Sequence, residues 1–502
     1  MLKRGLIGYL PVNIVQAVSG FGAIVVFTRL LSPADYGAYA LGFSLMSLVH
    51  TCLFTWLEAA MARFHAAEGD EAGQDKGGRA DLFATVYRTW AILALGFPVV
   101  AGAILVLLPV SLGLKLAMAA GLASILGRSL LKLAQERRRA AGVVAGYAWI
   151  DMAQVGGGFA IGALLALIGW GGAAPLAGGG IASAMLLIWA LPTELGFVRR
   201  GRFEPRRLKA YAAYGLPLSL SLVMSLALAT TDRFVLAAYM NEASVGAYHA
   251  GYSLSNRTLD VLFIWLGMAG GPAAVAALER GGVEALRRTA LDQARLMALI
   301  AVPASAGLAL VAQPLCALMV GPALAGRAAA VTPWVALSAL FSGATTYYFH
   351  TAFTLGRRTR LLLAAMAVPA VLNLVLVLLL TPRYGLNGAV WATAASYAIG
   401  LLASALLGRR ALALPIPWAT LAKVAVAVAG MALAVAALPA LGGLPEVVLK
   451  AGVGAVAYAA LALLLDAGGA RGRAIEGLRW IRGRPDQGRP ARSRALQSET
   501  AA

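Results

Sequence analysis

Charged residues are scarce in this 502-residue sequence. They make up 13% of the chain while hydrophobic residues make up 60%, and a soluble protein carries about a quarter charged residues. Apolar runs as long as the ~20 residues that a helix needs to cross a bilayer recur along nearly the whole chain. These runs exceed the length of barrel strands and do not alternate in polarity. We therefore predict an all-α polytopic membrane protein.

Acidic residues, histidine and cysteine are also few. Twenty-two acidic residues against 42 basic ones give a net charge of +20. The two cysteines, Cys52 and Cys316, lie in or near apolar runs, so no disulfide framework is implied. The four histidines lack metal-ligand spacing, and no phosphate-binding Walker loop is present. No predicted outer loop could house a catalytic domain. We expect no enzyme, no catalytic residue, no metal site and no cofactor.

The apolar runs predict about fourteen membrane-spanning helices. Their predicted ranges are 8–29, 36–62, 83–109, 112–133, 143–169, 175–197, 211–236, 244–270, 290–319, 331–355, 360–380, 386–408, 417–439 and 446–465. Basic residues concentrate in every second loop, as they do in cytoplasmic loops. We therefore expect a bacterial inner-membrane protein with both termini cytoplasmic, and the net charge reflects this topology and not nucleic-acid binding.

One segment of the chain repeats. Gly37-Ala-Tyr-Ala-Leu-Gly-Phe-Ser-Leu45 returns 209 residues later as Gly246-Ala-Tyr-His-Ala-Gly-Tyr-Ser-Leu254. Six spans in each copy give both copies the same orientation, so the two lobes are parallel repeats. The predicted division is an N-lobe over 1–205, a C-lobe over 206–411, two extra helices within 412–465, and a basic, disordered cytoplasmic tail over 466–502.

Polar residues inside the predicted spans are the candidate site, because lipid makes them costly unless they pair or face water. Candidates come from the first, second, seventh and eighth spans: Asn13, Gln16, Arg29, Thr51, Glu58, Asp232, Arg233, Ser253, Asn256, Arg257 and Asp260. Ser253, Arg257 and Asp260 share one helical face. Arg257 is the one arginine expected well inside the membrane.

Each candidate also has a structural alternative. Arg257 and Asp260 are spaced to form a pair that only packs helices, and Glu58 is placed either to bind a coupling proton or to pair with Arg63. Asn13 and Gln16 are suited to interhelical hydrogen bonds. The arginines near the span ends are long enough to reach the membrane interface. The sequence leaves these alternatives open.

Several segments resemble a known family. Phe27-Thr-Arg-Leu-Leu-Ser-Pro-Ala-Asp-Tyr-Gly-Ala-Tyr39 is similar to the opening motif of polysaccharide biosynthesis proteins, the Wzx-type flippases of the multidrug/oligosaccharidyl-lipid/polysaccharide exporter superfamily. Thr231-Asp-Arg-Phe-Val-Leu236 and Asn387-Gly-Ala-Val-Trp-Ala-Thr393 resemble their seventh and twelfth spans. The resemblance implies two lobes around a central cavity that opens alternately to each side of the membrane.

The resemblance also implies a substrate, a polyprenyl-pyrophosphate-linked oligosaccharide carried from the cytoplasmic to the periplasmic leaflet, with coupling to H⁺ or Na⁺. Membrane lipids, a polysaccharide polymerase and chain-length proteins are the implied partners. Arginine suits such a substrate because its fork of donors binds phosphate. Two alternatives remain: an organic-cation exporter of the same superfamily, for which Glu58 and Asp260 would serve, and a lipid II flippase.

Overall fold

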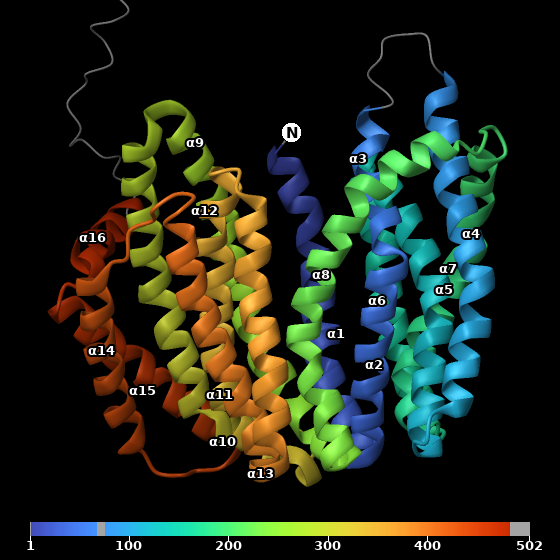
Figure 1. Ribbon diagram of the computed structural model, residues 1–502. Helices are drawn as coiled ribbons and strands as arrows, with labels where there is room; N and C mark the ends of the chain where they lie inside the picture. Colours follow the sequence, from blue (N-terminus) through green and yellow to red (C-terminus); the bar gives the residue numbers. More distant parts are fainter. Residues whose placement is uncertain (1, 68–75, 482–502) are drawn as a thin grey trace, which may run out of the picture.

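The computed structural model describes residues 2–67 and 76–481, and this part of the chain is helical, without strands (Figure 1). The principal helices are α1 (Leu2–Leu30), α2 (Pro33–Leu53), α3 (Thr55–Ala67), α4 (Lys76–Leu107), α5 (Leu112–Ala140), α6 (Val144–Leu167), α7 (Ala174–Val198), α8 (Pro205–Tyr239), α9 (Glu242–Leu310), α10 (Ala312–Met319), α11 (Pro322–Ala344), α12 (His350–Leu355), α13 (Thr359–Gly408), α14 (Trp418–Ala436), α15 (Gly443–Leu464) and α16 (Ala470–Ile481). Short helical turns η1 (Gly171–Ala173), η2 (Thr345–Phe349) and η3 (Ala467–Gly469) link some of them.

The number of membrane crossings agrees with the prediction. Eleven helices are long and apolar enough to cross a bilayer, and the bent pair α2–α3 makes a twelfth. α9 has 69 residues and α13 has 50, so each exceeds the ~30 Å hydrocarbon core at ~1.5 Å per residue. Each also contains one glycine with positive φ, Gly282 at 66° and Gly385 at 56°, a conformation that glycine adopts without strain.

The two long helices fold back at these glycines. Gly270 packs against the side chain of Gln293 on the far side of the first break, and Gly400 packs against Pro369 across the second. Each helix is therefore a hairpin of two crossings. Twelve candidate spans plus these two additional crossings give fourteen.

The outer surface of the bundle is apolar. In α4, Leu95 is 78% exposed and Leu107 is 81% exposed, and Ile188 of α7 is 78% exposed. A soluble protein rarely leaves so wide an apolar surface in water. Exposed aliphatic side chains over whole helices are what a lipid environment accepts, so the chain is a multi-pass membrane protein.

The helices form two bundles. α1, α2, α5, α6 and α7 pack on one another in the first, and α8, α9, α11 and α13 pack in the second (Figure 1). α14 and α15 pack as a pair, with α14 against α9. This is the predicted arrangement of two lobes with two extra helices. The predicted boundaries at residues 205 and 411 stay predictions.

The bundles meet at the repeated sequence. A Cβ added to Gly37 of α2 would strike the backbone carbonyl of Glu242, and one added to Gly246 of α9 would lie 2.6 Å from the carbonyl oxygen of Pro33. Nearby, the Gly321 amide donates to Thr28 Oγ1 at 2.8 Å. The matching glycines of the two repeats therefore allow α2 and α9 to cross in close contact, at the end of α1 remote from the N-terminus.

The predicted tail is partly ordered. Residues 470–481 form α16, and the prediction of disorder is wrong for this part. Arg471 explains the difference, since its guanidinium donates to the carbonyls of Leu463 at 2.7 Å and Leu464 at 2.6 Å and so caps α15. Residues 482–502 of the predicted tail lie outside the described residues.

Candidate functional site

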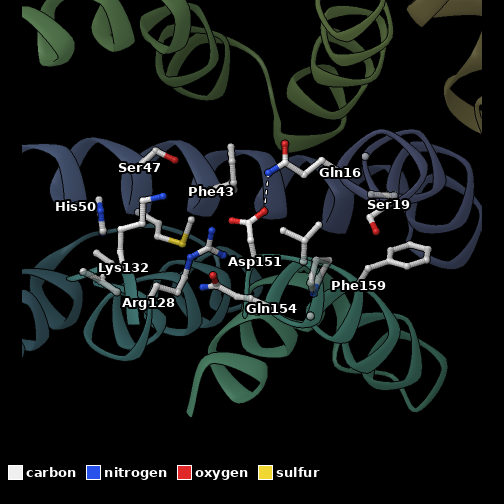
Figure 2. Close-up of a pocket in the computed structure, with 18 of the residues that line it drawn as sticks. Gln16, Ser19, Phe43, Ser47, His50, Arg128, Lys132, Asp151, Gln154 and Phe159 are labelled. Atoms are coloured by element: carbon white, nitrogen blue, oxygen red, sulfur yellow. Dashed lines mark hydrogen bonds between the residues drawn. The ribbon is translucent and has the colours of Figure 1, made fainter. Parts of the chain in front are cut away.

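A cavity of about 670 Å³ lies inside the first bundle (Figure 2). α1, α2, α5, α6 and α7 form its walls, and the second bundle contributes Leu226 of α8 and Arg257 of α9. We call it the basic cavity. Its polar lining residues are Gln16, Ser19, Ser47, His50, Thr51, Arg128, Lys132, Gln135, Asp151, Gln154 and Arg257.

The charge of this cavity is predominantly positive. Arg128, Lys132 and Arg257 face one carboxylate, Asp151. Lys132 lies 3.6 Å from Glu136, one turn further along α5. In the described part of the chain, neither Arg128 nor Arg257 has an ion-pair partner or a hydrogen-bond acceptor. Two unpaired guanidinium groups are therefore available to an anion that enters.

Glycines make room for both guanidinium groups. An added Cβ at Gly179 of α7 would lie 2.9 Å from Arg128 Nη1, and one at Gly20 of α1 would strike the guanidinium of Arg257. The arginines therefore lie flat against facing helices. Side chains at these two glycine positions would displace them.

Glutamine side chains form hydrogen bonds between the helices that line the cavity. Gln16 Nε2 donates to Asp151 Oδ2 at 2.7 Å and joins α1 to α6. Gln154 Nε2 donates to Ser183 Oγ at 2.9 Å and joins α6 to α7. Figure 2 shows Arg128 beside Asp151 and Gln154, with Gln16 on the opposite wall. The carboxyl group of Asp151 is thus held by an amide donor.

Four aromatic rings also line the basic cavity. Phe27 and Phe159 meet edge to face at 5.8 Å, and Tyr39 lies 6.1 Å from Phe27 and 6.2 Å from Phe43. These rings belong to α1, α2 and α6, near the close contact of the two bundles. They supply the aromatic part of the cavity lining.

The second crossing bends next to the cavity. α2 and α3 meet at 47° around the fully buried Phe54. His50 Nε2 lies 2.9 Å from Glu58 Oε1, and so the pair bridges the bend. Glu58 is 8% exposed, while His50 lines the cavity. No ion pair joins Glu58 to Arg63 in the described residues, so the predicted alternative partner is wrong.

A separate buried polar cluster surrounds Asp232 of α8. Tyr248 Oη donates to Asp232 Oδ2 at 2.5 Å, and the Thr393 hydroxyl donates to the same oxygen. Asp232 Oδ1 has no hydrogen-bond partner within 3.5 Å in the described residues, and the fully buried Asn373 side chain lies beside this carboxyl group. Oxygen atoms of this kind are the ligands that hard cations prefer. The cluster could also hold a proton on the carboxyl group.

A second pocket of about 250 Å³ lies in the other bundle. We call it the hydroxyl pocket. Its polar lining residues are Ser225, Tyr252, Asn256, Asp260, Ser342, Thr345, Thr346, His350 and Tyr397. Two of them, Thr345 and Thr346, belong to η2, a π-helical turn, and π-turns are frequent at functional sites.

Three of the predicted residues, Gln16, Thr51 and Arg257, line the basic cavity. Asn256 and Asp260 line the hydroxyl pocket instead. Arg257 and Asp260 therefore face different spaces although their spacing puts them on one helical face, and no ion pair joins them in the described residues. The two groups are still close enough to attract each other electrostatically, so the predicted packing pair stays a prediction.

The remaining predicted residues lie outside both spaces. Asn13 has an exposed side chain, and Ser253 is buried against His249. Arg29 donates to the carbonyls of Leu318 at 2.7 Å and Met319 at 3.1 Å, so it caps α10 across the contact of the two bundles.

Arg233, which is also predicted, is buried within the second bundle. Its Nη1 donates to Ser44 Oγ of α2 at 2.8 Å, and its guanidinium lies 4.9 Å from the Tyr252 ring. It thereby joins the two bundles and does not line a cavity.

Sequence reasoning missed Arg128 and misplaced Lys132. Arg257 is not the only arginine inside the membrane, because Arg128 lies in the middle of α5 and faces the same cavity. The signal was present, since Arg128 is the single arginine in the predicted span 112–133 and lies farther from its ends than Lys115 and Lys132. Lys132 ended that span and was assigned to the basic loop, but α5 continues to Ala140 and holds it in the cavity wall.

Comparison with known proteins identifies the family. The model of a family described as "Polysaccharide biosynthesis protein" matches residues 74–325, half of the chain. The chain therefore belongs to the polysaccharide biosynthesis protein family. No curated protein sequence matches it.

Solved structures share the fold. One is the lipid II flippase MurJ in an inward closed conformation, with a TM-score of 0.75, 13% identity, and coverage of 91% of this chain and 98% of that one. Another is a multidrug resistance MATE family transporter of the MOP superfamily in an inward-facing conformation, with a TM-score of 0.57, 16% identity, and coverage of 80% and 94%. The first of these proteins is named as a flippase and the second as a transporter, and this chain shares their fold.

Proposed function

We propose that this member of the polysaccharide biosynthesis family flips a polyprenyl-(pyro)phosphate-linked oligosaccharide from the cytoplasmic to the periplasmic leaflet of the bacterial inner membrane. Alternating access of the two bundles would move the polar headgroup while the polyprenyl chain stays in lipid. Both termini then lie in the cytoplasm. A surface polysaccharide is the product class, and a polymerase and chain-length proteins are the expected partners downstream.

The observation that supports this proposal is the pair of unpaired guanidinium groups, Arg128 and Arg257, in a polar chamber within the membrane. Inserting an unpaired arginine at this depth of the membrane costs ~2.5–3.5 kcal/mol on insertion scales. A protein that carries such an arginine usually uses it to bind a ligand. A pyrophosphate offers acceptors on several oxygens and binds guanidinium groups bidentately. Lys132 adds a third positive charge.

The same charge argues against an organic-cation exporter. A cationic substrate in the basic cavity would face three like charges and one carboxylate, and like charges placed together disfavour binding. Lipid II also carries a pyrophosphate, so the charge does not separate it from other lipid-linked glycans. The complementation experiment described below distinguishes these two substrates.

Ion coupling belongs to the proposal as well. The free Oδ1 of the buried Asp232, with the Asn373 side chain beside it, makes this cluster our proposed site for the coupling Na⁺ or H⁺. Asp232→Asn keeps the size of the side chain and removes its charge. We expect the variant to bind substrate normally and to lose the dependence of transport on the ion gradient.

The test is deletion of the gene followed by complementation. We expect the deletion strain to lose a surface glycan and to retain lipid-linked intermediates on the cytoplasmic face of the membrane. Normal glycan export in a strain with no redundant transporter would contradict the proposal. Rescue of a peptidoglycan defect by this chain would assign lipid II as the substrate instead.

A further inference from the structure

α16 follows the last membrane crossing but is too short to cross a bilayer itself. It has 12 residues, and a crossing helix needs ~20. It joins α15 through η3, and Lys423 Nζ of α14 donates to the carbonyl of Asp466, just before η3, at 3.3 Å. α16 therefore lies at one end of the pair α14 and α15, on the side of the molecule where α1 begins (Figure 1). The proposed topology assigns this side to the cytoplasm.

A cleft of about 620 Å³ lies between α16 and α9. We call it the α16 cleft. Residues of α9 on both sides of its glycine break, η3 and the first turn of α16 form its wall, and its polar lining residues are Thr289, Asp292, Gln293, Arg295 and Arg473. α9 extends ~36 Å from Glu242 to the lining residue Leu266 at ~1.5 Å per residue, and this length exceeds the ~30 Å hydrocarbon core. The cleft is therefore at the level of the lipid headgroups.

Arg473 places an unpartnered positive charge in the α16 cleft. Its Nη1 atom is buried and has no hydrogen-bond partner, and no ion pair involves Arg473 in the described residues. A buried charge is costly unless an opposite charge or hydrogen bonds compensate it. The carboxylate that lines the cleft, Asp292, already pairs with Arg295 at 3.2 Å. Two guanidinium groups thus face one carboxylate, and the cleft suits an anion.

The α16 cleft also offers apolar surface. Leu266, Ala273 and Leu296 of α9 line it. On α16, Ile475 is 50% exposed and lies about 200° around the helix from Arg473 at 3.6 residues per turn. The helix therefore directs a cation toward the cleft and an aliphatic side chain away from it, as helices that lie in the membrane interface do.

Phosphate is the anion that this arrangement suits. Guanidinium groups bind it through parallel, charge-assisted hydrogen bonds. At headgroup depth on the cytoplasmic side, phosphate groups belong to anionic lipids, and basic pockets between transmembrane helices bind such headgroups. A lipid also covers the apolar wall of the cleft, which a free phosphate ion does not.

We infer that the α16 cleft binds the phosphate group of an anionic phospholipid from the cytoplasmic leaflet, between Arg473 and Arg295. The bound lipid joins α16 to α9 and so links the C-terminal helices to the second bundle. The inference rests on the proposed topology. It is independent of the transported substrate, because the α16 cleft and the basic cavity share no lining residue.

Titration of the purified full-length protein in detergent tests this inference. The probes are dihexanoyl phosphatidylglycerol, zwitterionic dihexanoyl phosphatidylcholine, inorganic phosphate and polyprenyl pyrophosphate. We expect the wild type to bind phosphatidylglycerol at least ten-fold more tightly than phosphatidylcholine or inorganic phosphate. Arg473→Ala should remove this preference, and Arg473→Lys should restore part of it because the ammonium keeps the charge. Ala273→Trp fills the cleft from α9, leaves α16 unaltered, and should lower the affinity for phosphatidylglycerol at least ten-fold.

The control is Arg288→Ala, which removes an 80% exposed arginine of α9 outside the cleft and should keep the preference. An undiminished preference in both Arg473→Ala and Ala273→Trp, or equal wild-type affinity for the two phospholipids, would overturn the inference. Equal affinity for phosphatidylglycerol and inorganic phosphate would replace the lipid with a free anion. Weaker binding of polyprenyl pyrophosphate by Arg473→Ala would make the cleft part of the substrate path instead. Absence of any wild-type binding to polyprenyl pyrophosphate would count against the proposed function alone.

Discussion

At the scale of single residues, the guanidinium of Arg128 is the feature most directly tied to function. It lies in the middle of an apolar helix, against a glycine and without an acidic partner in the described residues. A charge held in this way would be stabilised by an anion that enters the chamber. Removing it should therefore affect substrate binding more than folding.

Arg128→Ala is the first prediction. Charge-assisted hydrogen bonds contribute ~1.5–3 kcal/mol, so the affinity for a polyprenyl pyrophosphate should fall about 10- to 150-fold. Arg128→Lys should restore part of it, because an ammonium keeps the charge and loses the bidentate geometry. Titration of the purified protein measures the effect, with the 80% exposed Arg288→Ala as control. Equal affinities in the Arg128 variants and the wild type would contradict a role of Arg128 in substrate binding and leave it with a structural role.

Glu194 of α7 is the residue whose removal we expect to lower the stability of the fold. It is 1% exposed, accepts from Arg137 at 2.8 and 2.9 Å and from Tyr87 at 2.9 Å, and lies 3.3 Å from Arg138. Breaking a buried ion pair by removing one partner costs ~3–5 kcal/mol. We predict that Glu194→Ala lowers the melting temperature in detergent by several degrees. The exposed Glu284→Ala is the control, and an unchanged melting temperature would show that the pair contributes no net stability.

At the scale of helices, the crossing of α2 and α9 decides how closely the bundles approach. The absence of a side chain at Gly37 lets the two backbones touch. Overpacking of a close contact costs ~1–3 kcal/mol, which shifts a two-state equilibrium by about 5- to 150-fold. A side chain at this crossing should favour the state in which the bundles separate here.

Gly37→Val is the prediction at this scale. Its reporter is the buried Thr28→Cys at the same contact, in a background without Cys52 and Cys316. We expect a membrane-impermeant maleimide to label this cysteine faster in the Gly37→Val variant. Gly102→Val is the matched control, because an added Cβ at Gly102 meets nothing within 4 Å. Equal labelling rates in the two variants would mean that this contact does not open.

The two hairpin helices, α9 and α13, show which features of the helices could be predicted from the sequence. The number of crossings followed from apolar length, which the bilayer thickness fixes. The breaks at Gly282 and Gly385 were placed within loops predicted between spans, and positive φ at glycine accounts for their sharpness. The helical start of the tail was not predicted, because the cap of Arg471 on α15 joins segments whose approach only the fold determines.

At the scale of the whole molecule, alternating access requires the bundles to separate at the contact that is closed here. Ser111, the N-cap of α5, donates to Glu242 Oε1 of α9 at 2.8 Å, so these exposed side chains join the two bundles. Cysteines at both positions, in a background without Cys52 and Cys316, should form a cross-link that stops transport. A reductant should restore it.

The control for this cross-link stays inside one bundle. Ser32 Oγ donates to Asp35 Oδ2 at 2.7 Å, and cysteines at these positions should leave transport unchanged when oxidised. Full transport through the cross-linked Ser111–Glu242 pair, measured in proteoliposomes with a labelled lipid-linked glycan, would exclude separation of the bundles at this contact.

The sequence by itself determined the class, the number of crossings and the repeated lobes, because bilayer thickness and the cost of burying charge in lipid act on local composition. It also identified Gln16, Thr51 and Arg257 of the basic cavity. Only the tertiary structure decided that Arg128 and Lys132 join them, that Glu58 contacts His50, and that Arg257 and Asp260 face different spaces. Which neighbour a side chain meets depends on how whole helices pack, and helical spacing along one segment contains no information about the helix opposite.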